Sequence, residues 1–111
     1  MQTDEGSCEH VAEFLAALSH QNRVKLIALL REGPKTVVEL SEAIGLSQSA
    51  TSQHLQILRG YGIVGVTRVG NQSYYSIADQ RVLQLCKLAQ QIISDRIREL
   101  SEKIDVIKFV S

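Results

Sequence analysis

The chain has 111 residues, enough for one domain with an apolar core but too few for two. Apolar residues make up 44% of it and charged residues 22%, which is ordinary for a globular protein in water. Twelve basic residues balance twelve acidic ones, and this net charge of zero, taken alone, argues weakly against nucleic-acid binding. No apolar run could cross a membrane, and the acidic N-terminus lacks the features of a signal peptide, so we expect a cytoplasmic protein.

The chain is expected to begin with a flexible segment and two helices. Residues 1–8 form the flexible segment, and one domain spans residues 9–111. Apolar spacing predicts a first helix over 9–19 and a second over 20–31. The apolar positions expected to face inward are Val11, Phe14, Leu15 and Leu18 in the first helix, and Val24, Ile27, Ala28 and Leu30 in the second.

A third helix is predicted after a break at Gly33 and Pro34, which cannot continue the second. Thr36 and Glu39 have the spacing of a capping box, in which each satisfies a backbone N–H of the other, so this helix should span 37–44. Residues 45–47 then form a tight turn into a fourth helix. Two helices joined by such a turn are typical of a helix-turn-helix.

The fourth helix has one apolar face. Ser47 is the expected N-cap, because its hydroxyl can accept a backbone N–H, and Gly60 is the expected left-handed stop. Helical spacing places Thr51, Leu55 and Leu58 on the inward face. Two further apolar residues, Ala50 and Ile57, are expected beside them.

The opposite face of this helix carries amides and hydroxyls but no carboxylate. These groups hydrogen-bond to the base edges in the major groove of DNA. None of the twelve acidic residues lies between Glu42 and Asp79, as expected of a surface that approaches phosphates. We therefore predict a recognition helix for double-stranded DNA. Its base-edge candidates are Gln48, Ser49, Ser52, Gln53 and Gln56, with Arg59 at a phosphate. His54, at the edge of the face, is a candidate structural or phosphate-contacting residue.

A β-hairpin is predicted next. Residues 63–68 and 72–77 are rich in strand-forming side chains, and 69–71 supply the turn. A hairpin directly after a helix-turn-helix is a wing. Arg68 and Gln72 flank its tip, where a cation can border the minor groove. The alternative interpretation of the fourth helix and the hairpin is an ordinary solvated surface.

The chain ends in a helix predicted over about 79–109. A domain of this size cannot cover the apolar stripe of so long a helix, so we expect a homodimer formed through the terminal helices. The stripe consists of Val82, Cys86, Ala89, Ile93, Ile97, Leu100, Ile104 and Ile107, widened by Leu85, Leu88 and Ile92.

The predicted fold class is mainly α with one β-hairpin, a winged helix-turn-helix. In this order of elements, and at residues 18–26, 40–55 and 70–75, the chain resembles the ArsR/SmtB family of small dimeric bacterial repressors. The resemblance implies a transcriptional repressor that leaves its DNA operator when an unknown effector acts. It is strongest to the branch often fused to a rhodanese sulfurtransferase domain, although no such domain is present in this sequence.

The metal sites known from this family lack their usual ligands here. Where one site has cysteines on the third helix, the chain has Thr36-Val37-Val38-Glu39. In the other site, on the last helix, Asp79 and Asp95 match, but Arg81 and Ile92 replace the histidines. Two carboxylates alone do not make a tetrahedral zinc site.

The two cysteines leave three interpretations open. Cys8 and Cys86 are a candidate redox or sulfur-sensing pair, and the helix dipole near Cys8 would favour its thiolate. Related sulfur sensors use cysteines on the second and last helices, and Ala28 occupies the second-helix position here. Alternatively, Cys8, His10 and Cys86 could form an atypical metal site, or both could be ordinary thiols, since disulfides are rare in the cytosol.

No enzyme is predicted. The sequence has no catalytic triad order, phosphate-binding glycine loop or paired-carboxylate motif, and no cofactor is expected. The alternative to a DNA-binding regulator is a winged-helix protein-interaction module, which would have no need to exclude acidic residues from its fourth helix and wing.

Overall fold

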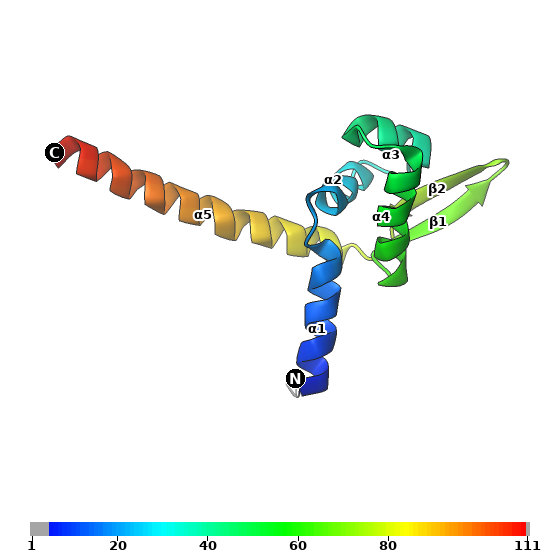
Figure 1. The fold of residues 1–111 in the computed structure, drawn as a ribbon, viewed down its shortest axis with the longest axis horizontal. Coiled ribbons are helices and arrows are strands. Elements are labelled where there is room, and N and C mark those ends of the chain that lie inside the picture. The colour runs from blue at the N-terminus through cyan, green and yellow to red at the C-terminus, as the bar shows by residue number, and fades with distance from the viewer. Residues whose placement is uncertain (1–4, 111) are drawn as a thin grey trace.

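In the part of the chain that the structure describes, seven secondary-structure elements follow one another in the expected order. The computed structural model describes residues 5–110, with side chains described for residues 6–102. Four helices come first, an antiparallel hairpin follows, and a long helix ends the chain (Figure 1), which is the winged helix-turn-helix arrangement. The elements are α1 Glu5–Leu18, α2 Gln21–Leu30, α3 Val37–Ile44, α4 Gln48–Gly60, β1 Val64–Val69, β2 Gln72–Ile77 and α5 Arg81–Val110.

The capping box of α3 is present. Thr36 Oγ1 accepts a hydrogen bond from the Glu39 backbone N–H at 3.2 Å, and the Glu39 carboxylate accepts one from the Thr36 N–H at 3.0 Å. Gly45 follows the helix in the left-handed conformation, with φ of 72°. These local contacts explain why α3 has the predicted bounds.

The start of α1 and the end of α4 differ from expectation. Residues 5–8, placed in a flexible segment from the sequence, form the first turn of α1. Apolar periodicity reports only the packed part of a helix, so it misses such a turn. The prediction for Gly60 was wrong, because Gly60 is still helical and the left-handed residue is Gly62, with φ of 71°. The N–H groups of Gly62 and Ile63 donate to the carbonyls of Arg59 and Leu58, which completes a Schellman motif.

The hairpin has a shorter turn than predicted. Its strands pair from Val64 opposite Ile77 to Val69 opposite Gln72, so only residues 70–71 connect them. Gly70 has φ of 62°, a conformation that glycine adopts without strain in a two-residue turn.

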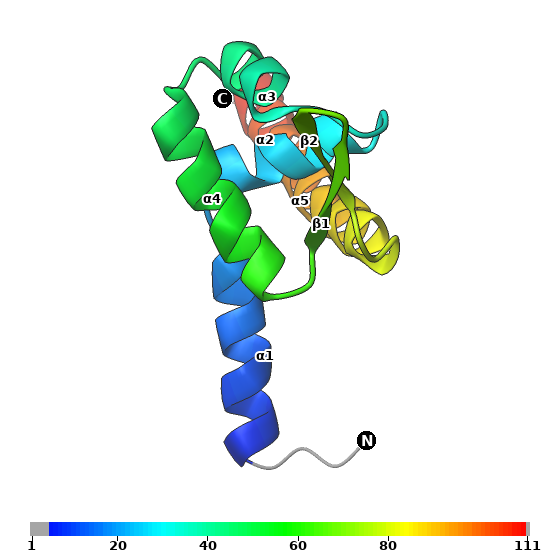
Figure 2. The same ribbon diagram turned by 90° about the vertical axis from the view of Figure 1, so that its right-hand side faces the viewer.

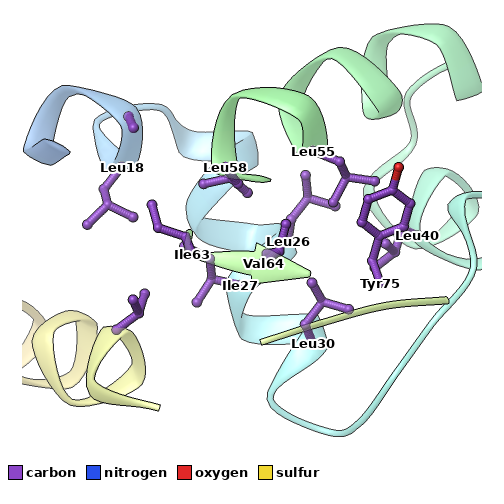
Figure 3. Close-up of a cluster of buried hydrophobic side chains, with 12 residues drawn as sticks. Leu18, Leu26, Ile27, Leu30, Leu40, Leu55, Leu58, Ile63, Val64 and Tyr75 are labelled. Carbon is purple, nitrogen blue, oxygen red and sulfur yellow. The ribbon is translucent and has the colours of Figure 1, made fainter. Parts of the chain in front are cut away.

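The core lies between α2, α4 and the start of β1 (Figure 3). The predicted inward face of α4 is confirmed, since Thr51, Leu55 and Leu58 are all 0% exposed. Beside them, Ala50 is partly buried, but Ile57 is 42% exposed. The apolar face of α4 is therefore narrower than the sequence suggests.

The inward face of α2 was only partly predicted. Ile27 and Leu30 are buried as expected, and Leu26 is buried with them. Val24 and Ala28, predicted to face inward, are exposed. Residues 24–30 are apolar at every position except Lys25, so periodicity cannot decide which face packs on α4.

α1 and α5 project from this body (Figures 1 and 2). In α1, Leu18 is buried and Phe14 partly buried, but Val11 and Leu15, predicted to face inward, are exposed. Val82 packs into the core at the start of α5, and the apolar side chains from Leu88 to Leu100 are exposed. The predicted stripe positions Ile104 and Ile107 lie outside the residues whose side chains are described. Within the described part of the chain, α5 included, no helix is long and apolar enough to span a membrane.

Candidate nucleic-acid interface

The beginning of α4 is anchored by its own cap. The Ser47 hydroxyl accepts a hydrogen bond from the Ala50 N–H at 3.1 Å, and the Thr51 hydroxyl donates to the Ser47 carbonyl at 2.8 Å. The buried Thr51 hydroxyl is thus satisfied within the helix, as a buried polar group requires. Because Thr51, Leu55 and Leu58 are buried on one side of α4, the opposite face of the helix is turned outward.

The outward face of α4 carries the candidates predicted to contact bases. Figure 2 shows α4 on the outer side of the body, with the hairpin beside it. Arg59 is exposed in the last turn. Among the five base-edge candidates, Ser52 is partly buried, and the exposed ones are Gln48, Ser49, Gln53 and Gln56.

The wing is tied to the body near its base. Lys35 and Tyr75 exchange two backbone hydrogen bonds, of 3.0 and 2.8 Å, which join β2 to the segment before α3. The Tyr75 side chain is 7% exposed and belongs to the core. The predicted contact residues Arg68 and Gln72 lie toward the tip of the hairpin, and both are exposed. The wing therefore presents them beyond a fixed base.

α4 and the wing carry no carboxylate, because none occurs between Glu42 and Asp79. Two neighbouring carboxylates in the sequence have partners. Hydrogen bonds from Thr36 hold the pKa of Glu39 below its usual value. Hydrogen bonds from Arg81 lower the pKa of Asp79 to about 2. Their lowered pKa values keep both carboxylates ionised, but neither lies on α4 or the wing, whose own side chains carry no charge that would repel phosphate.

A cluster of nitrogen-bearing side chains lies where α2 meets α4. Arg23 Nη1 donates a hydrogen bond to His54 Nδ1 at 3.4 Å, and the rings of His20 and His54 lie 4.5 Å apart. Burial lowers the pKa of His54, and the positive charges of His20 and Arg23 lower it further. The sequence placed His54 at the edge of the α4 face but missed its partners, because no local pattern links residues 31 and 34 positions apart.

The two thiols lie in different surroundings. Cys8 is exposed on α1. Cys86 is partly buried on α5, where it lines an apolar groove of about 450 Å³ with Leu15, Leu18 and Val24. Burial raises the pKa of the Cys86 thiol, which disfavours its reactive thiolate.

Cys8 does not line the groove around Cys86. It lies seven residues before Leu15, about 10 Å along a helix that rises 1.5 Å per residue. In the described part of the chain, no three histidine, cysteine or acidic side chains come close enough to hold a metal. The three candidate ligands Cys8, His10 and Cys86 therefore do not assemble within one chain.

The fold and this surface define a winged helix DNA-binding protein. Comparisons with known proteins narrow this class to one family. A family model described as "Bacterial regulatory protein, arsR family" matches residues 20–66. The HTH-type transcriptional regulator NmtR of Mycobacterium tuberculosis is 42% identical over 82 residues, which cover 74% of this chain and 68% of NmtR. This chain belongs to the arsR family of bacterial regulatory proteins.

Solved structures agree with that assignment. The crystal structure of M. tuberculosis Rv0081 matches with a TM-score of 0.79 and 34% sequence identity, covering 91% of this chain and 99% of that one. The winged helix-turn-helix domain of Mycobacterium bovis Mb0332, solved by NMR as a homodimer, matches with a TM-score of 0.74 and 30% identity. This match covers 86% of this chain and 90% of that chain. Relatives of this kind are transcriptional regulators, several of them repressors, and not enzymes.

Proposed function

We propose that this protein is a dimeric, sequence-specific repressor that binds a DNA operator and is released from it by an effector. The observation that carries the proposal is the shared surface of α4 and the wing. It presents amide, hydroxyl and basic side chains, and no carboxylate occurs between Glu42 and Asp79. A surface without carboxylates does not repel DNA phosphates, whereas a wing that binds another protein would not need to exclude carboxylates.

The side chains of this surface divide into two roles. Gln side chains can pair with adenine through two hydrogen bonds, and Ser hydroxyls accept or donate to several base edges. The proposed base contacts are Gln48, Ser49, Ser52, Gln53 and Gln56. The proposed backbone and minor-groove contacts are Arg59, Arg68 and Gln72.

The exposed apolar residues of α1 and α5 support a two-fold dimer. On α5 the exposed stripe includes Leu88, Ile93 and Ile97, a surface that a soluble monomer rarely leaves uncovered. A second copy would cover it and place the two α4 helices about 34 Å apart, one turn of DNA.

Release of the operator is proposed to use thiol chemistry. Cys86 lies beside the apolar residues of α1 and α2 that the dimer would cover. Oxidation or persulfidation of the Cys86 thiol would therefore disturb how the two subunits pack against each other. The resemblance to the rhodanese-associated branch favours a sulfur-containing effector. Because Cys8 lies outside the groove of its own chain, a pairing of Cys8 with Cys86 would have to form between subunits.

The proposal is tested by fluorescence anisotropy with a labelled duplex from the sequence directly upstream of the coding region. We expect it to bind at least tenfold more tightly than a scrambled duplex of the same composition, with affinity falling steeply from 50 to 200 mM salt. Equal binding of both duplexes would exclude sequence-specific recognition. No binding to either would exclude the DNA-binding function.

The release step is tested on the bound complex with an inorganic polysulfide or a thiol oxidant. We expect the wild type to dissociate and Cys86→Ser to stay bound, while Cys8→Ser shows whether the second thiol takes part. Unchanged affinity of the treated wild type would remove thiol chemistry and leave the DNA-binding proposal intact.

A further inference from the structure

The cluster of His20, Arg23 and His54 joins the base-reading helix to α2. His20 caps α2, since its Nδ1 accepts the Asn22 N–H at 3.1 Å. His54 Nδ1 accepts from Arg23 at 3.4 Å, and the two imidazoles lie at a tilt of 50° with 4.5 Å between their centres. His54 directly follows Gln53, so the cluster borders the outward face of α4.

Several hydrogen-bond donors of the cluster have no acceptor among the described side chains. Both Nδ1 atoms act as acceptors, so each neutral imidazole carries its proton on Nε2. Among the described side chains, neither Nε2 has a hydrogen-bond partner, and the buried Arg23 Nε has none either. Donors without acceptors favour an added anionic acceptor.

Among the described side chains, no carboxylate pairs with the positive charge of Arg23. The charged or titratable groups that act on His54 are His20, the N-cap of α2, and Arg23, in the first turn of α2. The other elements packed against α4 are α1, α3 and β1, and no described acidic side chain of theirs contributes. From α1, the ring of Phe14 meets Tyr61 at the end of α4.

We propose that His20, Arg23 and His54 form a binding site for a DNA backbone phosphate beside the base-reading face of α4, and that phosphate binding there is coupled to uptake of a proton. This proposal rests on the DNA-binding function proposed above. The phosphate lies on the strand that flanks the bases contacted by α4, and the cluster contributes affinity without reading sequence.

The proton link follows from the geometry. Without DNA, a proton on His54 Nδ1 removes the acceptor for Arg23 and adds a positive charge beside the Arg23 guanidinium and the His20 ring. Burial already holds the pKa of His54 below its usual value, and His20 and Arg23 lower it further. A phosphate at the cluster favours the protonated form and raises that pKa. The complex then binds more protons than the free protein, so DNA affinity rises as pH falls.

The experiment measures DNA affinity at constant ionic strength between pH 8 and pH 6, with the upstream duplex and its scrambled counterpart. We expect the affinity of the wild type to rise about tenfold for both duplexes, the equivalent of one pKa unit. His54→Gln should lose most of this rise, and His20→Gln part of it. The matched control is Lys25→Gln, which removes an exposed cation from α2, the helix that carries Arg23. This variant should keep the full rise in affinity.

A second measurement does not depend on any variant folding. NMR titration of the wild type follows the ring C–H signals of His54 with and without duplex, and we expect its pKa to be higher in the complex. Duplex binding with an unchanged His54 pKa and equal pH slopes in wild type and His54→Gln would overturn this inference and leave the proposed function standing. Absence of binding at every pH would overturn both.

Discussion

The body and the arms of this molecule bury their apolar side chains differently. In the body, formed by α2, α3, α4 and the hairpin, Leu26, Leu55 and Ile63 are each 0% exposed. In the arms, α1 and α5, Val11 is 53% exposed and Ile93 58%. The body completes its core within one chain, whereas the arms leave an apolar surface exposed, which the proposed dimer would cover. Under the proposed function, the surface that contacts DNA and the surface that joins two copies therefore lie on different parts of the chain.

The largest effect is expected in the body. Leu55→Ala should lower the free energy of unfolding by about 3 kcal/mol, because it leaves a cavity in a fully packed site. Urea denaturation at fixed protein concentration measures this, since the stability of a dimer depends on concentration. Gln56→Ala, at the next and exposed position, should change it by less than about 0.5 kcal/mol. Equal losses would mean that the body core is not closed as described.

The second largest effect is expected from a charge placed on the exposed apolar face of α5. Ile93→Glu would bury one unpaired charge from each copy, so the dimer should weaken on the order of a hundredfold, about 2.8 kcal/mol. Sedimentation equilibrium measures the dissociation constant, and far-UV circular dichroism checks that the body stays folded. Gln91→Glu adds the same charge on the other side of α5 and should leave the dimer intact. A dimer unaffected by Ile93→Glu would place the interface elsewhere.

On the surface of the body, Gln53→Ala should weaken binding to the upstream duplex by about 1–3 kcal/mol, because a base-edge contact is lost. The preference over the scrambled duplex should fall with it, while the dimer constant stays the same. Anisotropy titrations with both duplexes give these values. Gln84→Ala on α5 serves as the control. An unchanged preference in Gln53→Ala would remove this residue from the reading face.

The smallest effect is expected at the wing. Arg68→Ala should weaken both duplexes alike and reduce the slope of log K against log salt by about one unit, because one phosphate contact is lost. Titrations at four salt concentrations measure the slope. Arg98→Ala, which removes an exposed arginine from α5, should not change it. If the slope of Arg68→Ala matches that of the wild type, Arg68 lies away from the phosphates.

Most of the body could be predicted because its signals are local. The capping box of Thr36 and Glu39 and the N-cap Ser47 involve residues three positions apart, and their pairing depends little on the rest of the chain. The end of α4 was misplaced by two residues, because the choice of Gly62 over Gly60 is made where Ile63 enters the core.

The sequence by itself determined the order of elements, the turn before α4 and the absence of acidic residues from α4 and the wing, because composition and short-range spacing carry that information. Only the tertiary structure decided that α2 packs on α4 with Leu26 and leaves Val24 to the groove around Cys86. It also decided that His20 and Arg23 meet His54. Contacts between residues more than thirty positions apart depend on how helices cross, and helix crossing leaves no periodic signal in the chain.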